Sequence, residues 1–295
     1  MYSDCFFNFS QIFQNEGLEE SSQILSDWAK VKPYFALDCG IRADDIWTRV
    51  ENFKSCVEEL ENEDDKKNLK KMIHFCAGIM PDYDSVMNRF DYIDELETTI
   101  NDFKSSGDEF QNNLVALGPS GIDHDWNSVE YSGRDHDFFD SQIIEDECDL
   151  FAMQLTLAKK LDMPFVLHSR QGFKNSMDVI KAVKWNKGFI HGYSYSKSEL
   201  EFFLDLGWYV SFNGSVTFSG KKNADEIGEI INYVPKDRLL IETDSPYYAP
   251  VPLKNSKNNP NNLNYIYEFI GAKRNLSSNK LSDIVDSNCK KLFSL

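Results

Sequence analysis

The sequence predicts a single-domain (β/α)8 TIM barrel that spans residues 1–295. Three observations predict this fold: eight short apolar runs, polar segments with helical periodicity between the runs, and the absence of a Gly-rich phosphate-binding turn after the first run. Runs that are apolar almost throughout are typical of parallel strands that helices cover on both faces. A chain of 295 residues, 41% of them hydrophobic, is long enough to form one such barrel and to bury its core.

The expected strands and helices alternate along the chain. The eight expected strands are residues 2–9, 34–41, 72–80, 113–122, 163–168, 188–193, 208–213 and 238–243. Two of the segments between them show a clear apolar stripe at helical spacing. Residues 44–61 carry the stripe Ile46, Val50, Phe53 and Val57, and residues 148–161 carry Leu150, Phe151, Leu155 and Ala158.

Three other segments complete the predicted organisation. The charge run at residues 58–71 is expected to be a solvated helix end and loop, because blocks of charge usually lie on the surface. Residues 251–262, which are rich in Pro, Asn and Lys, are expected to form a loop after the eighth strand. Residues 263–295 should supply closing helices.

Composition excludes several classes of protein. The formal net charge of −17 argues against a surface that gathers nucleic acid through clustered Lys and Arg, so any contact with DNA has to be local. The six cysteines include no Cys-x-x-Cys pair, which predicts reduced and mostly buried thiols. The N-terminus has no basic segment followed by an apolar run, and no stretch approaches the length of a membrane span. We therefore expect a cytoplasmic protein that does not contact a membrane.

Polar residues end three of the apolar runs. His168 follows residues 164–167, His191 follows residues 188–190, and Asp244 follows residues 239–243. Chemistry in a (β/α)8 barrel takes place at the carboxyl ends of the strands, and two imidazoles with one carboxylate suit a divalent metal ion. The alternative is that each is an ordinary hydrogen-bonded residue at the junction of a strand and a loop. If the histidines share one ion, their nitrogens should lie about 3 to 4 Å apart.

These strand ends resemble a known family. Residues 154–170 end in His168-Ser169-Arg170, residues 188–194 read Gly-Phe-Ile-His-Gly-Tyr-Ser, and residues 239–250 contain Glu-Thr-Asp-Ser-Pro around Asp244. With residues 203–214, they are similar to the fifth to eighth strands of the TatD family of metal-dependent deoxyribonucleases. The resemblance implies a metal-dependent barrel in which His168, His191 and Asp244 are metal ligands. It also implies that Asp244 and Arg170 are catalytic, and that Arg170 and Ser194 contact the substrate.

The chain departs from the family pattern at other ligands. The family's first strand ends in Asp-x-His-x-His, whereas this chain reads Asp4-Cys5-Phe6-Phe7-Asn8. The glutamate that bridges two metals in the family is replaced by Pro119, and the third-strand His-Pro-His by residues 80–82, Met-Pro-Asp. Phenylalanine cannot coordinate a cation, and proline offers only a backbone carbonyl. We therefore expect at most one divalent ion, Zn²⁺, Mg²⁺ or Mn²⁺, with no metal at all as the alternative.

Acidic and imidazole side chains near the lost positions could compensate for them. Asp4, Asp123 and His124 lie at expected strand ends, and Asp82 follows the third strand. The alternative is that Asp123 matches a structural aspartate of the family and that His124 is a loop residue.

Two main hypotheses for function follow. The first is a TatD-like hydrolase of phosphodiester bonds whose activity is reduced or altered because only one ion remains. The second is a catalytically inactive relative that serves in binding or scaffolding, because groups that contact the metals directly have been replaced. A hydrolase of another amide or ester is a third reading. The expected partners are DNA or a phosphorylated small molecule, the protein partner is unknown, and the chain is expected to be a monomer.

Overall fold

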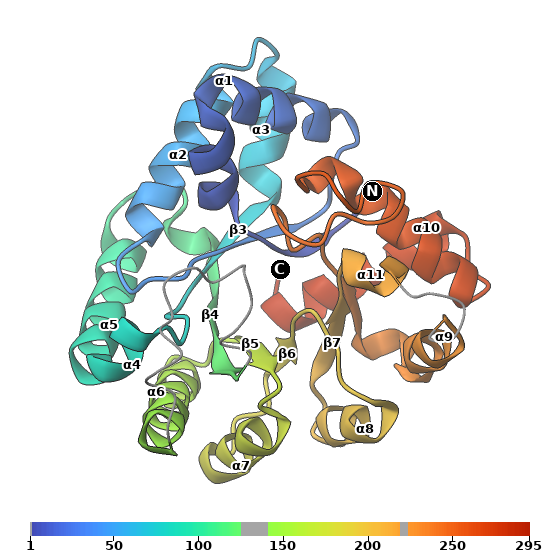
Figure 1. Cartoon of the computed structure of the whole chain (residues 1–295). Coiled ribbons are helices and arrows are strands. Elements are labelled where there is room, and N and C mark those ends of the chain that lie inside the picture. Colours follow the sequence, from blue (N-terminus) through green and yellow to red (C-terminus); the bar gives the residue numbers. More distant parts are fainter. Residues whose placement is uncertain (1, 125–140, 219–223) are drawn as a thin grey trace.

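The computed structural model describes residues 2–124, 141–218 and 224–295. Within these residues, eight parallel strands form one sheet in the order β1 to β8, and each strand pairs with the next along the chain. The helices form a ring outside the strands (Figure 1). The predicted (β/α)8 barrel is confirmed.

The strands are short and the helices longer. The strands are β1 Asp4–Phe7, β2 Ala36–Cys39, β3 Ile73–Ala77, β4 Leu114–Asp123, β5 Phe165–Arg170, β6 Gly188–Ile190, β7 Tyr209–Phe212 and β8 Leu239–Ile241. The α-helices are α1 Phe9–Lys30, α2 Ile46–Glu58, α3 Glu63–Met72, α4 Tyr83–Met87, α5 Arg89–Ser105, α6 Ser141–Lys160, α7 Phe173–Val183, α8 Lys197–Asp205, α9 Ala224–Tyr233, α10 Leu263–Lys273 and α11 Ser278–Phe293. Short 3-10 turns cover Gln111–Asn113, Gly214–Phe218, Lys236–Arg238 and Pro260–Asn262.

Two predictions about the connecting segments have different outcomes. Residues 263–295 form the helices α10 and α11, as expected. The charge run was predicted to be a helix end and loop, and this is wrong because it contains α3. The side chain of Asn62 caps α3 by accepting from the amides of Asp64 and Asp65, while Leu69 and Met72 are its buried side chains. A charged surface helix needs only such a narrow apolar contact with the barrel.

The first and last strands meet through main-chain and side-chain hydrogen bonds. The amide of Asp244 donates to the carbonyl oxygen of Phe6 at 2.9 Å, and the amide of Asn8 donates to Ser245 at 2.8 Å. The carboxylate of Asp4, which is fully buried, accepts from the Thr243 amide at 2.8 Å and from the Thr243 hydroxyl at 2.6 Å. Asp4 therefore ties β1 to the end of β8.

Helix α11 closes the amino-terminal end of the barrel. The ring of Phe293 stacks on Phe35, just before β2, at 4.7 Å between centroids, and meets the edge of Phe189 in β6 at 6.2 Å. Asn288 donates to the carbonyl oxygens of Lys236 and Leu239, each at 2.8 Å. These contacts cover the amino-terminal end of the barrel, whereas in the described part of the chain a cavity opens at the carboxyl end.

A buried ion pair joins α2 to the sheet. The guanidinium of Arg49 donates to Asp38 Oδ2 in β2 at 2.8 Å, to Asp45 Oδ1 at 2.8 Å and to the carbonyl oxygen of Cys76 in β3 at 2.6 Å. Arg49 and Asp38 are each 1% exposed, so these charges are stabilised by one another and not by water. The network holds β2 and β3 in register beneath the helix.

Two sequence predictions concern cysteines and membranes. All six cysteines are free thiols, five of them buried and Cys148 partly exposed, as predicted. Among the described residues, no helix has the length and apolar character needed to cross a membrane.

Candidate active site at the mouth of the barrel

A cavity of about 740 Å³ opens at the carboxyl ends of the strands. Its walls come from β1, β4 and β5 and from the segments that follow β2, β3, β6, β7 and β8, and they include Phe6, Pro119, His168, His191, Asn213 and Asp244. Each of the three candidate metal ligands predicted from the sequence therefore faces the same space. Arg170 and Ser194, the candidate substrate contacts, also line it.

The two histidines contact each other directly. His168 Nδ1 lies 2.9 Å from His191 Nε2, which is a hydrogen bond and slightly shorter than the separation expected across a shared ion. The other nitrogen of His168, Nε2, lies 3.0 Å from Asp123 Oδ2 at the end of β4. Both nitrogens of His168 are thus engaged with protein atoms. Asp123 is held in turn, because its amide donates to Glu147 in α6 at 2.8 Å.

A second group of potential metal ligands lies on the other side of His191. Donor atoms of His191, Glu242 and Asp244 all lie within 4.8 Å of one another. Glu242 accepts from the Gly192 amide at 2.7 Å, and Asn213 Nδ2 donates to Asp244 Oδ2 at 2.8 Å. The structure therefore brings His191 and Asp244 together with Glu242, and places His168 next to Asp123.

The backbone at the site adopts conformations that leave room for these groups. Asp244 has φ of +56° and Gly192 has φ of +55°, both in the left-handed region, which Asp tolerates better than most residues and Gly without strain. A Cβ at position 192 would lie 3.1 Å from Asn213 Nδ2, 3.7 Å from Glu242 Oε1 and 3.8 Å from Asp244 Oδ2. Glycine thus keeps open the space that these three polar groups surround.

Burial changes the acid–base properties of the donor group. It raises the pKa of Asp244 to about 7, with His191 opposing the shift, and it raises the pKa of Glu242 to about 8, with Ser211 and the Gly192 amide opposing the shift. Burial also lowers the pKa of His191, so this ring is neutral at pH 7. Each residue is less than a tenth exposed. A bound cation would reverse this cost of burial by stabilising the carboxylates.

The replaced positions have taken other roles. The ring of Phe6 stacks on His191, with 4.0 Å between centroids and 5° between planes. Asn8 is the N-cap of α1, and its side-chain oxygen accepts from the Gln11 amide at 2.9 Å. Pro119 lines the cavity with an apolar ring. Phe6 and Pro119 offer no side-chain ligand for a cation, and the side-chain oxygen of Asn8 is already engaged with the Gln11 amide.

The four candidates for compensation are also occupied. Asp4 binds Thr243, and Asp123 lies against His168. Asp82 caps α4, accepting from the Ser85 amide at 2.8 Å. His124 Nε2 lies 3.2 Å from Glu147 Oε2 and outside the cavity lining. Asp82 is the one of the four that lines the cavity.

Sequence reasoning missed Glu242. It lies inside an apolar run and so resembled one polar interruption of a strand. The available signal is its position two residues before Asp244, at the carboxyl end of the same apolar run, where a (β/α)8 barrel places its chemistry. Carboxylate oxygens of Glu242 and Asp244 lie within 4.8 Å of each other, and Glu242 is completely buried.

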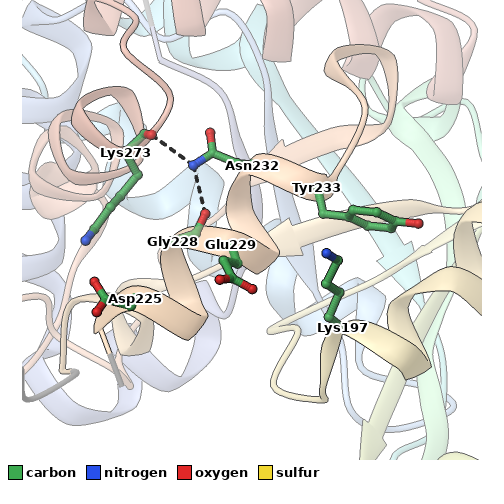
Figure 2. Close-up of a pocket in the computed structure, with 7 residues that line it drawn as sticks. All are labelled: Lys197, Asp225, Gly228, Glu229, Asn232, Tyr233 and Lys273. Carbon is green, nitrogen blue, oxygen red and sulfur yellow. Dashed lines mark hydrogen bonds between the residues drawn. The ribbon is translucent and has the colours of Figure 1, made fainter. Parts of the chain in front are cut away.

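A second hollow, of about 720 Å³, lies on the outer surface between α8, α9 and α10 (Figure 2). Its polar groups already have neighbours: Asn232 Nδ2 donates to the carbonyl oxygens of Gly228 and Lys273, and Lys197 Nζ lies 4.7 Å from the centre of the Tyr233 ring. Unlike the mouth of the barrel, its described lining residues include no histidine and no buried carboxylate. The mouth is therefore the candidate active site.

One known protein family matches most of this chain. The sequence profile of TatD related DNases matches residues 23–294. This chain belongs to the TatD family. An uncharacterized metal-dependent hydrolase of Buchnera aphidicola is 30% identical over 254 residues, which cover 83% of this chain and 88% of the relative. The 3'-5' ssDNA/RNA exonuclease TatD of Rahnella sp. is 31% identical over 191 residues, which cover 62% of this chain and 66% of the relative.

Solved structures of TatD proteins share the fold. A TatD homologue from Escherichia coli aligns with a TM-score of 0.72 and 19% identity, over 100% of this chain and 98% of the other. A TatD family hydrolase from Entamoeba histolytica aligns with a TM-score of 0.72 and 18% identity, over 99% and 97%.

The metal dependence named for TatD relatives can be tested against the donors of this chain. A pair of ions does not fit, because Phe6 and Pro119 carry no donor and the oxygen of Asn8 caps a helix. A single ion does fit, because His191 and Asp244 present ligand atoms within 4.8 Å of each other. In addition, two buried atoms of this group, His191 Nδ1 and Glu242 Oε2, have no hydrogen-bond partner among the described residues.

Proposed function

We propose that this TatD protein hydrolyses phosphodiester bonds with a single divalent ion, more slowly than a site with two ions would. The observation that carries the proposal is the buried group around His191 and Asp244 on the wall of an open cavity that Arg170 also lines. The name of the Rahnella relative supports a nucleic-acid substrate, and the metal-dependent hydrolases among the relatives support the use of an ion.

The residues at the mouth of the barrel have different roles in the proposed reaction. A divalent ion held by His191 and Asp244 would supply Lewis acidity at the phosphoryl group and lower the pKa of a water. Arg170, partly exposed at the end of β5, contacts the phosphate oxygens and offsets their charge. Asn213 fixes the Asp244 carboxylate through its hydrogen bond to Oδ2. Because the net charge is −17, the substrate enters as a strand end or a small molecule and not as an extended duplex.

Slow turnover follows from the replaced positions. Two ions can stabilise the attacking and the leaving oxygen together, and a single ion cannot do both. Phe6 also shields one face of His191 from the cavity. Both features lower the rate without removing the site.

An assay on end-labelled single-stranded DNA tests the proposal. We expect cleavage with Mn²⁺, Zn²⁺ or Mg²⁺ and no cleavage after chelation. Changing a residue that only hydrogen-bonds to a metal ligand typically lowers activity by roughly 10- to 100-fold. Asp244→Asn should lower the cleavage rate by more than this. Lys30→Ala, an exposed residue on α1 far from the cavity lining, is the matched control and should keep full activity. Cleavage that is equal in the wild type and in Asp244→Asn would refute the proposal.

The second candidate is binding without cleavage, and the stacking of Phe6 on His191 favours it. Fluorescence anisotropy with the same DNA separates the two. Tight binding that Arg170→Ala removes, together with no cleavage under any metal, would support the binding protein over the hydrolase.

A further inference from the structure

The hydrogen bonds of the two histidines determine which ring nitrogen is available. A carboxylate can only accept, so His168 Nε2 carries a proton and donates to Asp123 at 3.0 Å. In a neutral ring, His168 Nδ1 then has a lone pair and accepts from His191 Nε2 at 2.9 Å. A neutral His191 with its proton on Nε2 has its lone pair on Nδ1. The ring contacts thus turn an unprotonated nitrogen away from His168.

That nitrogen faces another acceptor. His191 Nδ1 lies 3.4 Å from Glu242 Oε1, and both residues are at least nine-tenths buried. Two lone pairs that face each other in a buried place repel unless a cation or a proton lies between them. Neither Nδ1 of His191 nor Oε2 of Glu242 has a hydrogen-bond partner in the described part of the chain. Among the described residues, two neighbouring buried side chains thus each keep one potential metal-ligand atom, Nδ1 of His191 and Oε2 of Glu242, without a hydrogen bond.

Neighbouring groups hold this point open and complete it. The Gly192 amide fixes Glu242 through a 2.7 Å hydrogen bond, and the missing Cβ of Gly192 leaves space between Glu242 and Asp244. Asp244 supplies a second carboxylate within 4.8 Å of the other donors. One imidazole nitrogen with two carboxylates is a ligand set for a borderline divalent cation such as Zn²⁺ or Mn²⁺.

We propose that one divalent cation is held by His191, Glu242 and Asp244, and that His168 is a positioning residue and not a metal ligand. Glu242, which directly follows β8, then takes the place of the carboxylate lost at position 119 in β4. His168 and Asp123 set the orientation and the tautomer of His191, as hydrogen-bond partners of metal-binding histidines do. This assignment rests on the proposed single-ion function and specifies its ligands.

Metal binding by matched variants of the full chain tests the assignment. The protein is stripped with a chelator, and Zn²⁺ binding is followed by calorimetry and elemental analysis, while Co²⁺ absorption reports the ligands. Glu242→Gln keeps an oxygen that accepts from Gly192 but removes the charge. His168→Gln removes the ring that contacts His191. Circular dichroism and thermal unfolding establish that each variant is folded.

We expect the wild type to bind one ion and Glu242→Gln to bind it at least about 1,000-fold more weakly. His168→Gln should still bind one ion, at most about 100-fold more weakly than the wild type and with an unchanged Co²⁺ spectrum. The loss of the ion, or a changed Co²⁺ spectrum, in His168→Gln would overturn the assignment. Full binding by Glu242→Gln would overturn it as well, while the single-ion function would stand. A wild type that binds no ion would remove both the assignment and the proposed function.

Discussion

Replacing Asp4 with Asn should make the stability of this barrel less dependent on pH. Burial raises the pKa of Asp4 from 3.8 to about 7 even though two hydrogen bonds from Thr243 oppose the shift. The folded protein therefore holds a proton at Asp4 that the unfolded chain has already lost at neutral pH. As the pH rises from about 4 to about 7, folding becomes less favourable, and above pH 7 the penalty is complete.

The size of this effect follows from the shift. Each pKa unit corresponds to about 1.4 kcal/mol, so the full penalty is about 4 kcal/mol, of which about 2.5 kcal/mol develops between pH 5 and pH 8. Asn carries no charge, and its oxygen still accepts from the Thr243 amide. The Thr243 hydroxyl loses its acceptor at Oδ2, at a cost of about 1 kcal/mol at every pH. The free energy of unfolding of Asp4→Asn, relative to that of the wild type, should therefore rise by about 2.5 kcal/mol from pH 5 to pH 8.

Urea unfolding of the metal-free protein at several pH values measures this gain. The control is Asp27→Asn, because Asp27 is half exposed and pairs with Lys30 on the surface. A stability difference between Asp4→Asn and the wild type that stays constant from pH 5 to pH 8 would refute the reasoning, since Asp4 would then titrate alike in the folded and unfolded chains.

Three further predictions concern the ion pair, the metal and the replaced ligands. Arg49→Met should lower the free energy of unfolding by about 3 to 5 kcal/mol, as measured in urea, because it leaves Asp38 buried without its cation. Zn²⁺ should bind at least about tenfold more tightly at pH 8 than at pH 6 in calorimetry, because protons compete for Asp244, whose pKa burial raises to about 7. Equal affinities would contradict this. The triple variant Phe6→His, Asn8→His and Pro119→Glu should bind more metal and cut single-stranded DNA faster than the wild type. A folded triple variant that does neither would show that the cavity has been remodelled beyond its ligands.

The sequence predicts the barrel because the signals for strands and helices are local. Apolar runs and stripes at helical spacing are visible without knowledge of partners, and residues 263–295 form helices as expected. Helix α3 was missed because only Leu69 and Met72 are buried among its charged residues. Two apolar side chains in ten residues make too weak a stripe to distinguish a surface helix from a loop.

The sequence predicts where the site lies but not which of its side chains contact one another. Strand ends place His168, His191 and Asp244 at the mouth, and all three line the cavity. Which of them act together depends on contacts of about 3 Å between strands, such as the one from His168 to Asp123, and no pattern along one chain gives these. The role of Glu242 was hidden in the same way, because its neighbours come from β7 and from the segment after β6.

The N-cap of α1 makes the loss of the family's first-strand ligands hard to reverse by evolution. Asn8 now satisfies the amide of Gln11 at the start of α1, whose first helical stretch runs to a kink at Gly17. A histidine restored at this position caps a helix poorly, so the return would cost about 1 kcal/mol before any metal could bind. Restoring Phe6 to histidine alone would not rebuild the second ion, so neither step brings an advantage by itself. A single substitution at either position is therefore expected to bring a cost in stability or no gain in metal binding, so the two positions would have to change together.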